Sequence, residues 1–407
     1  MPDVKLNCID KNSTLLLFWW YWPLYYVLLY SVFPSRAVVV MRYIVLILIF
    51  IASLENNKWR LNIRFVMFLL LYLIITSFNL ILVTYKYEVL IESLTSLLAF
   101  ITPIYLFSTK DFVLSNFIDR SFKWAISHTS FTLLAIFLAM TNIIGSWSYG
   151  NVATVTVANI IILIYGLLVD KTHNKIKILI TLVINSGALL VFGSRMPILA
   201  SVVVSLILAI LSFEKKPILK TCVFIILSIL ALGVLNYYRE ILSFIINTLN
   251  NYGIYSRALT ILARDIGTIS LVDMMQSSGR EDVWPIAIDV IKTRVGFPGG
   301  FGVIRHLTNG RINYSHNLFL DLGVVLGASI IPLFIMGMIR IRRMKQYLLK
   351  RERMFFITCF IFFIVTSLTG AYFLEDRYAI ISWGLIFFYQ GGYTNHCKGL
   401  LTEVENI

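Results

Sequence analysis

Long apolar segments dominate this sequence and restrict what the chain can fold into. Short polar segments divide it into runs of about 20 apolar residues, the length that a helix needs to cross ~30 Å of hydrocarbon. Because lipid offers no partner for exposed backbone groups, such runs span a membrane as helices. We expect about twelve transmembrane helices, near residues 15–33, 37–53, 65–84, 89–107, 125–145, 152–169, 178–193, 196–213, 221–237, 316–338, 355–373 and 378–393.

Composition supports this interpretation. Apolar residues make up 58% of the chain and charged residues 14%, and the mean hydropathy is +0.82. A soluble domain carries about 25% charged residues, so most of this chain avoids water. The expected fold class is an all-α polytopic integral membrane protein. Two of the predicted spans are interrupted, the second by Arg42 and the fourth by Glu92 and Pro103.

The basic residues predict how the chain is oriented. Cytoplasmic loops of membrane proteins carry an excess of Lys and Arg. With the amino terminus inside, the inner segments hold 22 basic residues and the short outer loops hold 4, leaving out the long segment 238–315. Both termini are therefore expected to be cytoplasmic. The net charge of +14 follows from this bias, and nucleic acid is not expected as a partner.

The predicted spans divide the chain into four regions: helices at 1–237, a large outer loop at 238–315, helices at 316–393 and a cytoplasmic tail at 394–407. The loop has no cysteine for a disulfide and no Asp/His cluster suited to a metal. Two of its stretches, 256–275 and 281–293, have apolar residues at helical spacing and predict amphipathic helices on the membrane surface. In the second, these residues are Trp284, Ile286, Ile288 and Ile291.

Arginine is the characteristic residue of the outer loop. Its planar, permanently charged group suits phosphate oxygens better than lysine does. A solvated surface with ion pairs is the alternative for any one of them. The segment holds seven arginines and one lysine: Arg239, Arg257, Arg264, Arg280, Arg294, Arg305, Arg311 and Lys292.

Two further residues lie where the predicted helices meet the outer surface. Arg195 follows the break Gly193-Ser194, so it is expected at the outer edge of the bilayer, facing an anion or extending to the interface. His316 begins a predicted helix within reach of the outer loop. A histidine is a good general base at neutral pH, although a lone one is often an interfacial polar residue. The segment 296–302 is rich in glycine and permits either close backbone approach or hinge motion.

In this order and sidedness, the motifs resemble the O-antigen ligase and polymerase superfamily. Ser194-Arg195 lies at a tight outer turn, and Ser278-Gly279-Arg280 precedes Trp284 in the long loop. The glycine-rich segment follows, with 15 residues between Arg280 and Gly296. His316-Asn317 then opens a helix, and Gly327 comes after nine further residues.

The resemblance implies a metal-independent glycosyltransferase with a GT-C-like membrane fold and no cofactor, located in the bacterial inner membrane. Its substrate would be an oligosaccharide linked through pyrophosphate to undecaprenol, and its partners would include membrane lipids and the flippase and chain-length regulator of the same pathway. Arg195 and Arg280 would bind the pyrophosphate, and His316 would deprotonate the acceptor hydroxyl. Four other arginines would contact sugar or acceptor phosphate: Arg257, Arg264, Arg305 and Arg311.

Three functions remain open within this reading. Ligases continue their pattern with a small or aromatic residue at the position of Ile330, so this departure favours an O-antigen polymerase over a ligase. A second arginine motif found in some polymerases is not evident. A polysaccharide transporter or flippase, the third alternative, would place polar groups along a path through the helices. Here the only carboxylates within predicted helices are Glu92 and Asp321.

Overall fold

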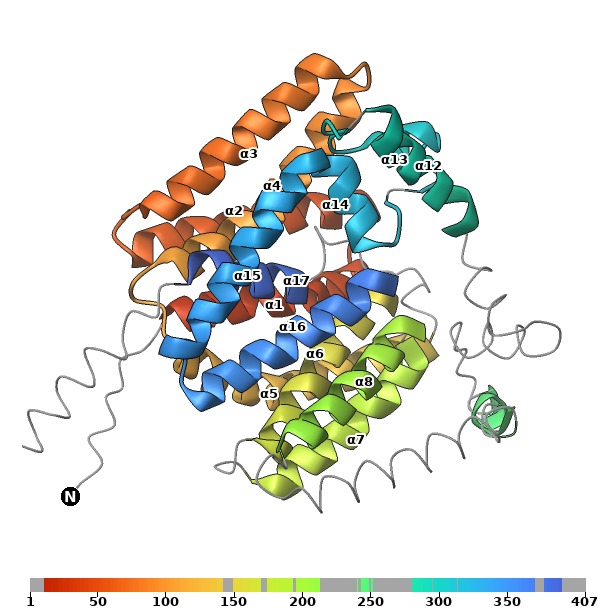
Figure 1. Cartoon of the computed structure of the whole chain (residues 1–407). Helices are drawn as coiled ribbons and strands as arrows, with labels where there is room; N and C mark the ends of the chain where they lie inside the picture. Colours follow the sequence, from red (N-terminus) through yellow and green to blue (C-terminus); the bar gives the residue numbers. More distant parts are fainter. Residues whose placement is uncertain are drawn as a thin grey trace, which may run out of the picture.

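The structure, a computed structural model, is helical throughout its described part. It describes residues 11–141, 149–169, 174–192, 195–212, 280–294, 296–312, 314–369 and 377–389, with short pieces between 240 and 251. Within these residues the chain forms helices and no strand, which confirms the all-α class (Figure 1).

Helices lie at nearly all the predicted positions. The first eight are α1 (Lys11–Tyr30), α2 (Ser35–Asn56), α3 (Ile63–Leu82), α4 (Lys86–Ser108), α5 (Leu114–Met140), α6 (Tyr149–Leu168), α7 (Lys175–Phe192) and α8 (Arg195–Ser212). The predicted helices at 221–237 and 256–275 lie outside the described residues. After them come α12 (Arg280–Thr293), α13 (Val303–Leu307), α14 (Leu318–Leu326), η2 (Gly327–Ser329), α15 (Ile330–Tyr347), α16 (Lys350–Thr369), α17 (Arg377–Trp383) and η3 (Gly384–Phe388).

Four of the described segments are long and apolar enough to cross a membrane: Arg36–Asn56, Ile63–Ile81, Lys86–Ser108 and Leu318–Met344. Large apolar side chains are also exposed along α2, α3, α7 and α15; Ile81 of α3, for example, is 78% exposed. Continuous apolar surface of this kind needs a lipid or protein neighbour. The chain is therefore a membrane protein.

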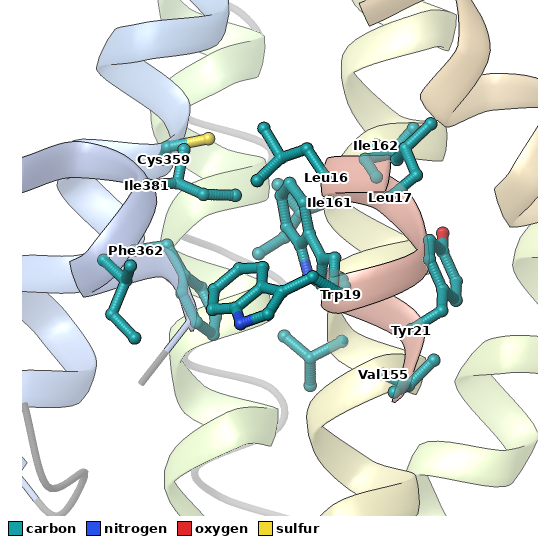
Figure 2. Close-up of a cluster of buried hydrophobic side chains, with 14 of the residues drawn as sticks. Leu16, Leu17, Trp19, Tyr21, Val155, Ile161, Ile162, Cys359, Phe362 and Ile381 are labelled. Atoms are coloured by element: carbon teal, nitrogen blue, oxygen red, sulfur yellow. The ribbon is translucent and has the colours of Figure 1, made fainter. Parts of the chain in front are cut away.

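The core is built around α1, of which 12 of 20 residues are buried. Figure 2 shows Trp19 of α1 among Ile161 of α6, Phe362 of α16 and Ile381 of α17. A surface helix buries one stripe of its circumference, whereas a helix apolar all round is buried. Helix α1 belongs to the second kind, because its contacts extend to α2, α4, α5 and α6.

The charged and broken positions in two predicted spans do not end the helices. Helix α2 continues past Arg42, whose guanidinium carbon lies 5.7 Å from the centre of the Tyr26 ring. Such a cation–π contact offsets part of the cost of placing a charge there. Helix α4 likewise runs through Glu92 and Pro103 to Ser108.

A second hydrophobic cluster attaches α12 and α13 to the turn between α3 and α4. It joins Val83, Tyr85, Val89, Val283, Ala287, Val290, Val303, Ile304 and Val324. In Figure 1, α12 and α13 lie at the end of the bundle where α3 meets α4, beside α14. This end of the bundle carries the sequence motifs discussed next.

Candidate active site

Helix α12 brings the arginine–tryptophan motif to the segment that contains His316. Arg280 is the first residue of α12, and Trp284 lies one turn further along. The indole N–H of Trp284 donates a hydrogen bond to the carbonyl of Ser315 (3.0 Å). Residues four apart share a helix face, so this bond sets the position of the helix start relative to His316.

Helix α12 packs inward through its smaller apolar residues. The buried residues are Val283, Ala287 and Val290, while Trp284 and Ile288 are exposed by 36% and 40%. Trp284 and Ile288 belong to the apolar face for which the sequence predicts a position on the membrane surface. Helix α12 lies close to α14, because a Cβ added at Gly323 of α14 would lie only 2.9 Å from the Ile291 side chain of α12.

His316 lies two residues before α14, in an unusual backbone conformation. Its φ is +61°, in the left-handed region, and its ring centre is 4.3 Å from that of Tyr314. The side chain is half-buried. Asn317 caps α14 by accepting hydrogen bonds from the N–H groups of Phe319 (3.0 Å) and Leu320 (3.3 Å), so the helix start is defined. The imidazole is therefore presented at a rigid helix terminus.

Asp321, one of the two carboxylates within the predicted helices, is buried at 2% exposure. Its Oδ1 accepts a hydrogen bond from the Ser315 N–H at 2.7 Å. With Glu92, Tyr314 and the backbone of Gly300 and Gly302, it lines a small pocket under the glycine-rich segment. Glu92 and Asp321, the two carboxylates of the predicted spans, thus line the same pocket.

The glycine-rich segment is held against Gly327. The Gly299 N–H donates to the Val324 carbonyl and the Ala328 N–H donates to the Gly296 carbonyl, each at 2.6 Å. Gly327 has φ +59°, and a Cβ there would lie 2.1 Å from the Gly296 oxygen. Gly327 therefore has to be glycine because the segment crosses directly over it.

The same segment is fixed by Arg294, one of the loop arginines, and by Tyr85, which the sequence did not single out. The Tyr85 hydroxyl donates to the Gly299 carbonyl (3.0 Å), and the Arg294 guanidinium donates to the Pro298 carbonyl (3.2 Å) and to the Tyr85 oxygen (3.4 Å). Burial raises the pKa of the Tyr85 phenol, and the charge of Arg294 opposes that rise. With bonds to α12, α14 and the α3–α4 turn, the segment is tied down rather than arranged as a free hinge. Tyrosine and arginine at these positions carried no motif that could have revealed the role.

The structure places the predicted arginines at different kinds of position. Arg195 opens α8 as Arg280 opens α12, and in both cases the structure describes the backbone and not the side chain. Arg257 and Arg264 lie outside the described residues. Arg305 in α13 and Arg311 after it are exposed. Among the described residues, no group of three His, Cys, Asp or Glu side chains is arranged to hold a metal ion.

Comparison with known proteins identifies the part of the chain that contains this site. Residues 180–335, less than half of the chain, match the family described as O-antigen ligase. The matched segment runs from α7 into α15 and includes Arg195, Arg280, His316 and Gly327. It confirms the resemblance to the O-antigen ligase and polymerase superfamily. Searches of curated proteins and of solved structures gave no match.

Proposed function

We propose that this chain, whose residues 180–335 match the family described as O-antigen ligase, is an O-antigen polymerase. It would join oligosaccharide repeat units, each linked through pyrophosphate to undecaprenol, into polysaccharide at the periplasmic face of the bacterial inner membrane. The observation that carries the proposal is the bond from Trp284 to Ser315. It connects the helix opened by Arg280 to the residue before His316, so a phosphate-binding group and a base are parts of one unit.

His316 is the proposed general base. Its imidazole takes the proton of the acceptor hydroxyl as that oxygen bonds to the anomeric carbon of the donor sugar. The bond from that carbon to the pyrophosphate oxygen breaks, and undecaprenyl pyrophosphate leaves. A positioned base of this kind contributes about 10²–10⁴-fold to a rate.

Arg195 and Arg280 are proposed to bind the pyrophosphate. Each is the first residue of a helix, where unpaired N–H groups and the helix dipole favour an anion. A guanidinium at that point adds fixed positive charge and a fork of donors. Charge placed in advance where a leaving group becomes negative is usually the largest catalytic contribution, and the proposed reaction obtains it from arginine without a metal.

Ligation is the second candidate, because the matching family is described as O-antigen ligase. A ligase would move finished polymer from the lipid carrier to lipid A-core. The residue at the ligase-specific position, Ile330, favours polymerisation. Both reactions use the same donor chemistry, so the acceptor distinguishes them. The flippase and the chain-length regulator of the pathway are proposed as partners in either case.

The surface polysaccharide of cells that lack the gene tests the proposal. With the polymerase lost, gel electrophoresis should show lipid A-core carrying a single repeat unit, and the plasmid-borne gene should restore the ladder. Uncapped core, with long polymer accumulating on the lipid carrier, would identify a ligase instead. An unchanged ladder would exclude both.

A further inference from the structure

The backbone of His316 is in a conformation that a histidine does not adopt without help. At φ +61° the Cβ crowds the following carbonyl, which costs about 1–2 kcal/mol for an L-residue other than glycine. Such residues persist where the surrounding structure determines the backbone more strongly than local sterics do. The contacts around His316 therefore show what holds it.

The peptide groups on both sides of Ser315 are held by side chains. Its N–H donates to the buried Asp321 carboxylate (2.7 Å), and its carbonyl, which belongs to the peptide bond with His316, accepts from the Trp284 indole (3.0 Å). The Ser315 hydroxyl adds a bond to the Asn317 carbonyl (3.0 Å). Rotation of the backbone before His316 would break at least one of these bonds.

The position of Asp321 costs free energy, because a carboxylate is buried there. It lies in an otherwise apolar helix, α14, where a leucine would pack without desolvating a charge. A hydrogen bond to a carboxylate is about twice as strong as one between neutral groups. Outside its own helix, Asp321 is hydrogen-bonded to Ser315, the residue before His316, and this interaction offsets part of the cost of burying the carboxylate.

We propose that Asp321 is a positioning residue for His316. Its carboxylate fixes the backbone of Ser315, and through it the direction in which the imidazole leaves the chain, relative to the helix that Arg280 opens. The proposal rests on the proposed function of His316 as a base. Asp321 acts through the backbone and does not touch the substrate.

Two substitutions separate the hydrogen bond from the charge. Asp321→Asn keeps a carbonyl oxygen that can accept from the Ser315 N–H, whereas Asp321→Leu removes every acceptor and keeps the branched shape of the side chain. The matched control is Asp289→Asn, which makes the same substitution at an exposed carboxylate on α12. In cells lacking the gene, the Asn variant should make polymer within about tenfold of the parent, since a neutral hydrogen bond replaces a charged one. The Leu variant should fall about 10²-fold, the cost of misplacing a reacting group by ~1 Å.

Labelling of histidines with diethyl pyrocarbonate supplies a readout independent of activity. In purified full-length protein, His316 should react faster in the Leu variant than in the parent or the Asn variant. The reagent should remain excluded from His128, which is 5% exposed in the bundle, in all of them. Mass spectrometry of the two peptides therefore distinguishes a released His316 from an unfolded chain.

The outcomes decide the proposal. Parental activity and labelling in the Leu variant would overturn it. An Asn variant as inactive as the Leu variant, with His316 labelled at the parental rate, would show that charge is required and overturn positioning by the hydrogen bond. If His128 also becomes labelled in the Leu variant, that variant is unfolded. The activity and the His316 labelling rate of the Asn variant then decide the proposal. A His316→Ala variant that still makes polymer would refute the proposed function, while the labelling would still report whether Asp321 holds His316.

Discussion

His316 combines a half-buried imidazole, a left-handed backbone and a position two residues before a capped helix, and together these restrict the direction of its side chain. We predict that His316→Ala lowers polymer synthesis by at least about 10²-fold, because the base is lost, while the amount of protein in the membrane stays constant. The polymer ladder and an immunoblot of membranes measure the two quantities. His396→Ala, in the predicted cytoplasmic tail, should leave the ladder as it is; a normal ladder for His316→Ala would remove the general-base role.

Gly327 is the glycine for which the structure requires the absence of a side chain most directly. We predict that Gly327→Ala destabilises the protein by about 1–3 kcal/mol through the backbone conformation alone. The clash with the Gly296 oxygen adds to that and displaces the glycine-rich segment. Thermal unfolding of the purified protein in detergent measures the loss.

A glycine within α7 provides the matched control. A Cβ added at Gly187 meets nothing within 4 Å, and alanine is favoured over glycine inside a helix by about 1 kcal/mol. Gly187→Ala should therefore keep or raise the unfolding temperature. Equal behaviour of the two variants would contradict the packing of the segment on Gly327.

From the sequence it was possible to predict which residues belong to the proposed site, but not which contacts those residues make. Trp284 and Gly327 are visible as members of motifs, but nothing in the spacing shows that the first binds Ser315 or that the second lies under Gly296. Asp321 and Tyr85 were missed as site residues because their partners are backbone groups, which are the same in every sequence. Interactions with the main chain leave no signature in the partner residue.

At the level of helices, the runs of apolar residues predicted well where helices lie, but predicted less well where a helix is interrupted. Residues 316–338 were expected as one helix, but the structure breaks it at Gly327–Ser329. The Ala328 N–H is bonded to the Gly296 carbonyl instead of continuing the helical ladder. A run of apolar residues indicates burial in lipid or protein. It does not show where a backbone N–H bonds to another segment instead of to its own helix.

The helices α1, α5, α6 and α7 are linked by a chain of buried polar side chains. Tyr21 donates to Asn159 (2.6 Å), Asn159 donates to Asn185 (3.0 Å), and Asn185 donates to Thr129 (2.8 Å). Hydrogen bonds between membrane helices contribute about 0.6 kcal/mol each on average. We predict that Asn185→Ala, which removes one of the two inner members, destabilises the bundle by about 1–2 kcal/mol.

Unfolding in detergent again provides the measurement, with a control on the same helix. Val183 is 65% exposed, so Val183→Ala should change the stability by less than about 0.5 kcal/mol. If the two variants were equally stable, the polar chain would not be holding the four helices together.

At the scale of the whole molecule, the apolar exterior and the position of α12 at one end of the bundle are relevant to how the chain is oriented in the membrane. We predict that α12 and α7 have their lysines on opposite sides of the membrane. In a chain whose four cysteines are replaced by serine, Lys292→Cys should react with an impermeant maleimide in intact spheroplasts. Lys175→Cys should react only after lysis. Both lysines are exposed, so access to the reagent is matched; labelling of both in intact cells would refute the predicted topology.

The burial of α1 also has a consequence for biogenesis. Trp19 lies among Ile161 of α6, Phe362 of α16 and Ile381 of α17, segments synthesised long after α1 (Figure 2). Until those arrive, α1 must wait in the bilayer with its aromatic surface turned to lipid or to an insertion factor. Quality control could recognise that surface as the mark of an unfinished chain, so a premature stop before α16 should send the product to proteolysis rather than leave a stable fragment.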